Sequence, residues 1–188
     1  EEDYVEDVIA ANSHALLMFF TNTGKVHTRK TYQIPEAGRT AKGSNIVNIL
    51  ELEAGEKVTA IISVPGFSDK EYLFMVTKRG IVKKTLLSEF EYQRKGGKIA
   101  LTLDDGDELV YVKHTSGNDD IIIATHDGLS ARFGEEDVRP MGRGARGVKG
   151  MTLSDGDYIV GCAVISEDKA LLTITEGGFG KRCEFDNF

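Results

Sequence analysis

Basic residues recur at similar places along this sequence, in a pattern suited to contacts with phosphate groups. Each of four short glycine-containing turns is followed by a segment with one or two cations. Duplex DNA carries about one negative charge per 1.7 Å of axis, so cations on a periodic surface gain affinity by releasing counterions. The pattern therefore predicts a surface that contacts duplex DNA without reading its sequence. The cations of this first group are Arg29, Lys30, Lys83, Lys84, Arg132, Lys181 and Arg182.

A second basic group lies in glycine-rich segments further along each repeat. The clearest is GRGARGVKG at residues 142–150, and related segments occupy residues 39–43 and 94–98. Glycine lets the backbone approach a phosphate closely, although it also supplies the positive φ that a tight turn requires. We interpret these glycines as structural and the neighbouring cations as phosphate ligands. The cations are Arg39, Lys42, Arg94, Lys95, Lys98, Arg143, Arg146 and Lys149.

The strand cations also have a simpler interpretation. Alternate residues of a strand often face water and are charged for solubility alone. Because the charges recur at matching offsets from one unit to the next, we favour the binding interpretation.

The sequence offers no arrangement typical of catalysis or metal binding. The histidines lack the i, i+4 spacing or Cys-x-x-Cys partners of a metal site, so we expect them at solvent-exposed or strand-edge positions. The acidic turns, such as residues 104–107, lack the further ligands and closing glutamate of a calcium loop. No serine or cysteine lies in a nucleophile motif. We therefore expect no catalytic residue, no metal and no cofactor in this chain.

A repeated β-structure must position the cations. The sequence matches itself at a period of about 50 residues, which is typical of a solenoid or a propeller. Each unit reads as a strand, a glycine turn and a second strand, then the basic glycine-rich loop, an apolar third strand, an acidic turn and a fourth strand. Almost no helical periodicity is present. These features predict an all-β fold of four-stranded antiparallel blades rather than a sandwich.

Three near-complete units can be delimited. They span residues 15–66, 67–118 and 119–166, with the end of a preceding blade at 1–14 and the start of a further blade at 167–188. The expected third strands are residues 46–50, 99–103 and 148–153, and the expected fourth strands are 58–64, 109–113 and 158–164.

Composition restricts where the cations can lie. The chain has 188 residues, 40% of them hydrophobic, and a formal net charge of -7. This length and apolar content suffice for a core. Because a net negative charge repels DNA, the cations must be segregated on one surface. Two cysteines without metal-ligand spacing, and no apolar run of the roughly 20 residues that span a membrane, lead us to expect a cytoplasmic protein.

The order of these elements resembles the C-terminal domain of gyrase A, one of the two proteins that make up DNA gyrase. The resemblance extends over the whole chain and is carried by residues 18–50, 73–110 and 139–161. It implies a β-pinwheel, a propeller-like ring whose four-stranded blades exchange strands and whose outer rim wraps duplex DNA. The implied positive wrap would support ATP-dependent negative supercoiling by a holoenzyme of two A and two B subunits. ATP and Mg²⁺ would be used elsewhere in that holoenzyme, and the chain itself would be a monomeric, non-catalytic part.

One motif departs from this family. Its diagnostic box, QRRGGKG, belongs to the first blade, whereas the nearest match here, residues 93–98, falls in the second complete unit and is followed by Ile99. This leaves open the related C-terminal domain of topoisomerase IV. Another alternative is a propeller that serves as a protein-interaction scaffold, and a propeller enzyme is a weaker one. Interface cores favour aromatic residues over charge, and this chain has no Trp, so DNA binding remains the favoured function.

Overall fold

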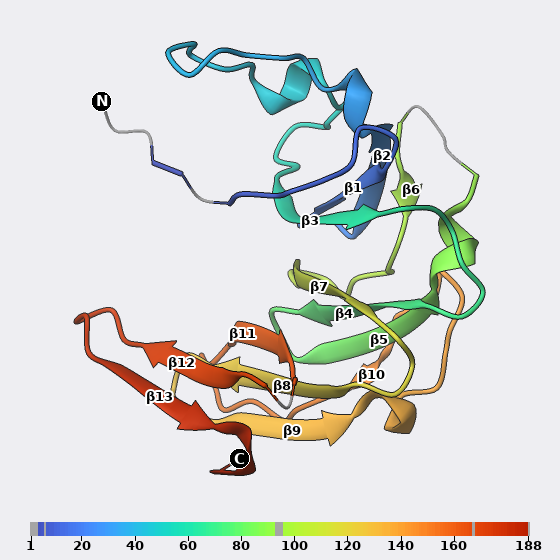
Figure 1. The fold of residues 1–188 in the computed structure, drawn as a ribbon. Coiled ribbons are helices and arrows are strands. Elements are labelled where there is room, and N and C mark those ends of the chain that lie inside the picture. The colour runs from blue at the N-terminus through green and yellow to red at the C-terminus, as the bar shows by residue number, and fades with distance from the viewer. Residues whose placement is uncertain (1–3, 6, 93–95, 167, 188) are drawn as a thin grey trace.

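A computed structural model describes residues 4–5, 7–92, 96–166 and 168–187, which form a series of antiparallel sheets (Figure 1). The first two sheets have four strands each, and the third has three. The first contains β1 (Leu16–Thr21), β2 (Lys25–Lys30), β3 (Val58–Val64) and β6 (Lys98–Ile99), and the second β4 (Tyr72–Thr77), β5 (Ile81–Leu86), β7 (Leu109–Thr115) and β10 (Val148–Lys149). The third contains β8 (Asp120–Thr125), β9 (Ser130–Gly134) and β11 (Ile159–Val164), and β12 (Ala170–Ile174) pairs with β13 (Gly180–Glu184).

Short 3-10 helices follow the second strand of each sheet. They are η1 (Thr31–Gln33), η3 (Leu87–Phe90), η4 (Glu135–Asp137) and η5 (Phe185–Asn187), and a further one, η2 (Ile46–Asn48), lies in the loop of the first unit. No helix among the described residues is long and apolar enough to cross a membrane.

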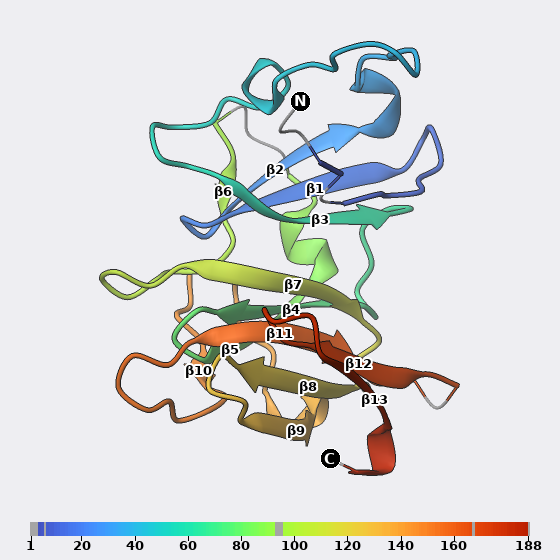
Figure 2. The ribbon, with the colours of Figure 1, turned by 90° about the vertical axis from the view of Figure 1, so that its left-hand side faces the viewer.

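Consecutive sheets exchange strands. In sequence, β6 follows β5, yet it pairs with β2 of the preceding sheet, and β10 pairs in the same way with β5. Figures 1 and 2 show β6 standing beside β2, away from the β4–β5 hairpin that precedes it in the chain. The second and third units are therefore each tied to the preceding unit by a two-residue strand.

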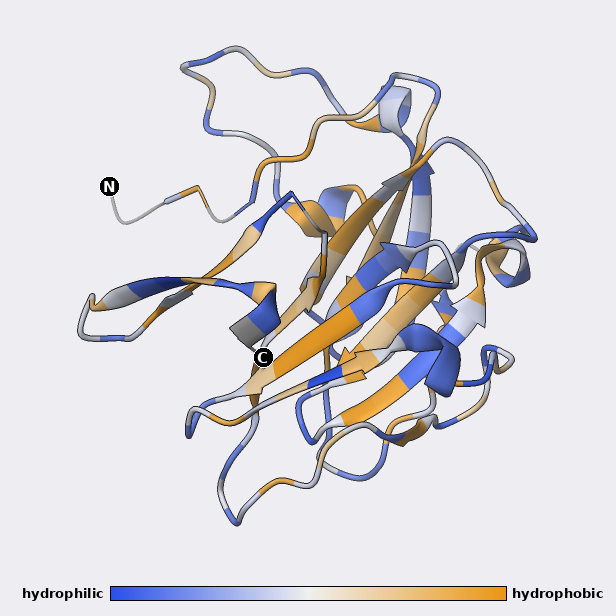
Figure 3. Cartoon of the chain, turned by 60° about the horizontal axis from the view of Figure 1, so that its bottom comes forward, coloured by the Kyte–Doolittle hydropathy of each residue, from blue (hydrophilic) through white to orange (hydrophobic). Residues whose placement is uncertain are grey.

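The core lies between neighbouring sheets. In β4, Leu73 and Met75 face the first sheet, whereas Phe74 and Val76 face the third. All four side chains are fully buried, which explains the continuous apolar run of this strand. Figure 3 accordingly shows the strongest hydrophobic colour along the strands of the stacked sheets.

The expected third strands were wrong in extent. Residues 46–50 contain the 3-10 helix η2, and residues 99–103 and 148–153 contribute only the short strands β6 and β10. Their apolar side chains are nevertheless used, because Ala100 and Leu101 are buried in the core while their amides bond to the Gly24 carbonyl. An apolar run indicates that its side chains are buried, but it does not indicate whether its backbone is hydrogen-bonded in a β-sheet.

Candidate nucleic-acid interface

The strand register corrects the alignment of the repeated cations. Phe20 pairs with Val26 in the first hairpin, and Val76 with Val82 in the second, so Val26 and Val82 are equivalent. By the same pairing, the residues equivalent to Lys83 and Lys84 can be found in the other hairpins. They are His27 and Thr28 in the first hairpin, Ala131 and Arg132 in the third, and Lys181 and Arg182 in the fourth. Arg29 and Lys30 lie further along β2 and are not equivalent to Lys83 and Lys84.

Lys83 is not an exposed rim cation, contrary to the sequence prediction. Its side chain is fully buried, and its Nζ donates to the carbonyl oxygens of Ala100 (2.8 Å), Ala145 (3.1 Å) and Arg143. Burial, together with the Arg143 charge, lowers the pKa of Lys83 to about 8, and Glu89 opposes this shift. A phosphate cannot reach an ammonium group in this position.

Lys84 and Arg132 also make contacts within the protein. Lys84 is buried, and its Nζ donates to the Glu135 carbonyl at 2.7 Å and lies over the Tyr72 ring. Arg132 donates to the Phe185 carbonyl at 2.8 Å and forms an ion pair with Asp120. Glu135 and Phe185 each begin the 3-10 helix of the following unit. Lys84 is therefore not the exposed rim cation that the sequence predicts, and Arg132, which is half-buried, makes the same kind of contact between units.

Three further candidate cations are partly or wholly buried. Lys98 is 9% exposed, and its Nζ bonds to the Phe90 carbonyl, so it does not fit the predicted role as a phosphate ligand. Arg29 is half-buried and donates to the Ile49 carbonyl, and Lys30 is half-buried as well. Arg94 and Lys95 lie outside the described residues.

The other candidate cations are placed where DNA could reach them. Arg146 has a side chain that is 60% exposed, and Arg143 is half-buried beside it. Lys149 is exposed on β10, the strand that crosses to the neighbouring sheet. The exposed candidates are Arg39, Lys42, Arg146, Lys149, Lys181 and Arg182.

We call residues 142–147 the arginine loop, and it is built against the preceding unit. Gly147 has φ +99°, and a Cβ there would lie 2.6 Å from the Val82 carbonyl oxygen, so glycine is required for this close approach. Thr102 Oγ1 donates to the Gly144 carbonyl at 2.8 Å. A hollow of about 450 Å³ lies between the loop and residues Glu89 and Ile99. The loop thus presents Arg143 and Arg146 at a boundary between two units.

The acidic turns have a structural role that the sequence did not reveal. Glu56, Asp107 and Asp157 are buried at equivalent places, and Asp107 and Asp157 each accept backbone N–H bonds from the first hairpin turn of their own unit. Glu56 instead accepts from Thr21 Oγ1 at 2.8 Å and lies 3.2 Å from His27 Nε2. Expecting His27 at a solvent or strand-edge position was therefore wrong.

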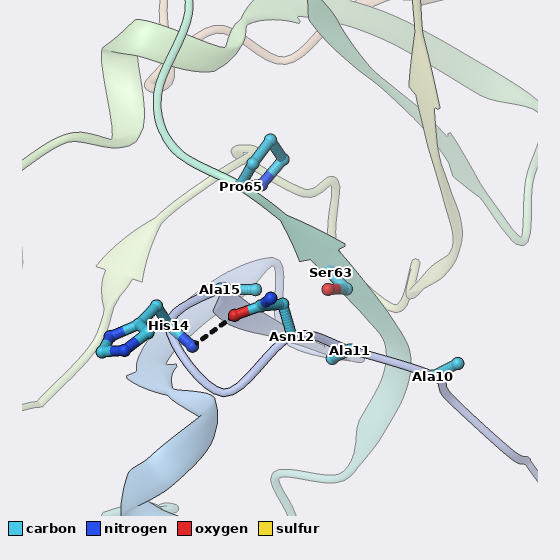
Figure 4. Close-up of a pocket in the computed structure, with 7 residues that line it drawn as sticks. All are labelled: Ala10, Ala11, Asn12, His14, Ala15, Ser63 and Pro65. Atoms are coloured by element: carbon cyan, nitrogen blue, oxygen red, sulfur yellow. Dashed lines mark hydrogen bonds between the residues drawn. The ribbon is translucent and has the colours of Figure 1, made fainter.

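Two other features lie apart from the candidate cations. Among the described residues, the metal-ligand types His126, Asp127 and Asp157 come within 4.8 Å of one another, and Asp157 Oδ1 accepts from the backbone N–H groups of Asp127 and Tyr158. A shallow hollow between residues 10–15 and the end of β3 is lined by three alanines and four other residues, and its single titratable group, His14, points away from it (Figure 4).

Comparison with known proteins identifies the family. Residues 15–65, 71–116, 119–166 and 169–188 match the family described as DNA gyrase C-terminal domain, beta-propeller. The DNA gyrase A protein of Clostridium acetobutylicum is 52% identical over 150 residues, covering 80% of this chain and 18% of that protein. The DNA gyrase A protein of Escherichia coli K12 is 44% identical over 182 residues, covering 97% of this chain and 21% of that protein. The chain thus spans about a fifth of the length of these curated relatives.

Solved structures agree with the sequence relatives. A topoisomerase IV C-terminal domain superimposes with a TM-score of 0.84 at 31% identity, over 94% of this chain and 55% of that one. A DNA gyrase A C-terminal domain superimposes with a TM-score of 0.78 at 28% identity, over 94% of this chain and 56% of that one. The predicted all-β, propeller-like fold and the resemblance to gyrase A are both confirmed. The chain therefore belongs to the family of DNA gyrase C-terminal, beta-propeller domains.

Proposed function

We propose that this chain binds duplex DNA without sequence preference and wraps it around an outer surface that carries the exposed cations. The observation that carries the proposal is the arginine loop, where glycines and backbone contacts hold Arg143 and Arg146 at a boundary between two units. Guanidinium groups suit phosphate because their N–H donors match its oxygen atoms. Contacts at successive units would share the cost of bending the duplex, which is several kcal/mol for a site of about 20–30 bp.

The proposed role extends to a larger assembly. The wrap would have a positive sense and would support ATP-dependent negative supercoiling by a gyrase of two A and two B subunits, in the bacterial cytoplasm at the nucleoid. The chain would act there as a monomeric, non-catalytic part, with ATP and Mg²⁺ used elsewhere in the holoenzyme. The equivalent domain of topoisomerase IV is the second candidate, because its solved structure superimposes with a TM-score of 0.84.

A topology assay tests the wrapping. Relaxed closed-circular plasmid is incubated with increasing amounts of the chain and a nicking-closing topoisomerase, and the linking number is measured after the protein is removed. Wrapping with a positive sense raises the linking number in proportion to bound protein. An unchanged linking number at saturating binding contradicts wrapping, and a lowered one contradicts the proposed sense.

A further inference from the structure

Lys83 lies where two consecutive units meet. Its strand, β5, belongs to the second sheet, whereas the carbonyl groups of Arg143 and Ala145 come from the arginine loop of the following unit. The third acceptor, the Ala100 carbonyl, lies directly after β6. An ammonium group has three N–H donors, and burying it without acceptors is costly. Three carbonyl oxygens from two units satisfy all three donors.

Backbone contacts to β5 hold both ends of the arginine loop, because the Met141 amide donates to the Lys84 carbonyl at 2.8 Å and Val148 pairs with Val82. A Cβ at Gly142 or Gly144 would meet no heavy atom within 4 Å, so neither glycine is packed against a neighbour on that side. Glycine also loses more conformational freedom on ordering than any other residue. Between these ends, Thr102 holds the loop through its hydroxyl, which donates to the Gly144 carbonyl, and through its amide, which donates to the Ala145 carbonyl at 3.3 Å. The Arg143 side chain also donates to the Ile99 carbonyl, and Arg146 pairs with Asp104.

The equivalent position in the first sheet makes a contact between units by a different means. His27 takes the place of Lys83 there, and a Cβ on Gly97 would lie 2.8 Å from its ring. Gly97, with φ +77°, directly precedes the exchanged strand β6, and Gly147 directly precedes the exchanged strand β10. The two glycines are therefore equivalent in consecutive units. This strand position thus contacts the following glycine-rich loop in both sheets, and Lys83 adds hydrogen bonds to the loop carbonyls.

We propose that Lys83 is a positioning residue, whose ammonium group holds the arginine loop across the boundary between two units and so presents Arg143 and Arg146 to the DNA backbone. The inference rests on the proposed DNA binding and adds a residue that DNA does not touch. A loop ordered before binding loses less entropy when it binds, so its contacts yield more affinity.

A mutant cycle tests the proposal. Lys83→Met keeps the length of the buried side chain and removes its donors. Binding of a 40 bp duplex (about four helical turns) is measured across salt concentrations for the chain, for K83M, for R143A/R146A and for the triple variant. Two lost phosphate contacts should reduce the slope of log K against log salt by about 1.8 and the affinity at 0.1 M salt by about 50-fold. We expect K83M to lose about 10-fold, and the triple variant to bind no more weakly than R143A/R146A.

Matched variants separate positioning from general destabilisation. Lys84→Met removes a neighbouring buried ammonium group that bonds to Glu135 rather than to the arginine loop, and it should leave the salt slope unchanged. If K83M does not fold, Thr102→Val removes an exposed attachment of the same loop and should lower affinity only when the arginines are present. If K83M binds DNA as tightly as the unaltered chain, the proposal is overturned; where K83M is unfolded, the same result for T102V overturns it. The proposal is also overturned if the loss of affinity in the triple variant equals the loss in K83M multiplied by the loss in R143A/R146A. Failure of the unaltered chain to bind would instead overturn the proposed function.

Discussion

At the scale of single residues, Lys83 and Arg146 are both cations, but one is buried and the other is exposed. Lys83 is 0% exposed and bonds to backbone carbonyl groups, whereas the Arg146 side chain is 60% exposed and pairs with Asp104. An exposed ion pair contributes about 0–1 kcal/mol, so a phosphate can replace the carboxylate at little cost. In the proposed DNA complex, Asp104 would therefore compete with phosphate for Arg146.

Removing this competitor should strengthen DNA binding. We expect Asp104→Asn to raise affinity for duplex DNA about two- to fivefold at moderate salt, because Arg146 no longer leaves an ion pair when it binds phosphate. The measurement is a fluorescence titration with a short duplex. Asp105→Asn is the matched control, since it removes the same charge from the same turn, where the side chain is not the partner of Arg146. Equal gains for both variants would show that only net charge matters.

Buried Glu56 makes a prediction about acid stability. Burial raises its pKa, but hydrogen bonds from the Glu53 amide, Thr21 and His27 outweigh this and hold the pKa below its ordinary value of 4.5. The carboxylate therefore contributes stability that is fully present above about pH 4.5 and is lost as pH falls through the lower, folded-state pKa.

Glu56→Gln leaves one acceptor oxygen where two are used, so we expect a loss of about 1–3 kcal/mol in the free energy of unfolding at pH 7. The difference from the unaltered chain should shrink as pH falls below about 4.5. Urea unfolding at several pH values measures both effects. Glu53→Gln is the control, because that side chain is 73% exposed and should change stability little. A pH-independent difference for E56Q would contradict the assignment of the lowered pKa.

At the scale of elements, the hairpins could be predicted from the sequence and the exchanged strands could not. Runs such as LFMVT followed by a glycine turn identify β4 and β5 because apolar side chains and turn chemistry are local signals. Residues Val148–Lys149 pair with β5, far away in sequence, over only two residues. Such a short strand leaves no periodic pattern, so its position depends on contacts between units.

The glycine that permits this exchange should be intolerant of change. We expect Gly147→Ala to destabilise the fold by about 1–3 kcal/mol, because its φ of +99° disfavours a side chain and the Cβ would meet the Val82 carbonyl. Gly144→Ala in the same loop has open space and should be tolerated. Thermal unfolding compares the two. Equal stability of both variants would mean that β10 does not dock as described.

At the scale of the whole molecule, a net charge of -7 means that the proposed DNA-binding surface would cover only part of the molecule. The family and the all-β, propeller-like fold could be predicted from the sequence. The exact cations could not, because Lys83, Lys84 and Lys98 are as basic in sequence as Arg146 but are buried, Lys83 and Lys84 at contacts between units. Whether such a lysine is buried depends on how neighbouring sheets stack, and a local sequence pattern does not predict this.

Salt-dependent DNA binding is the most direct test of the central claim that the exposed cations form the DNA surface. The chain is titrated against a duplex of about 40 bp at several salt concentrations, beside a variant in which the exposed candidates Arg39, Lys42, Arg146, Lys149, Lys181 and Arg182 are alanine. We predict that log K falls with log salt by about 0.9 for each phosphate contact, and that the variant loses several contacts from this slope. No binding at low salt, or equal slopes for the two proteins, would contradict the claim.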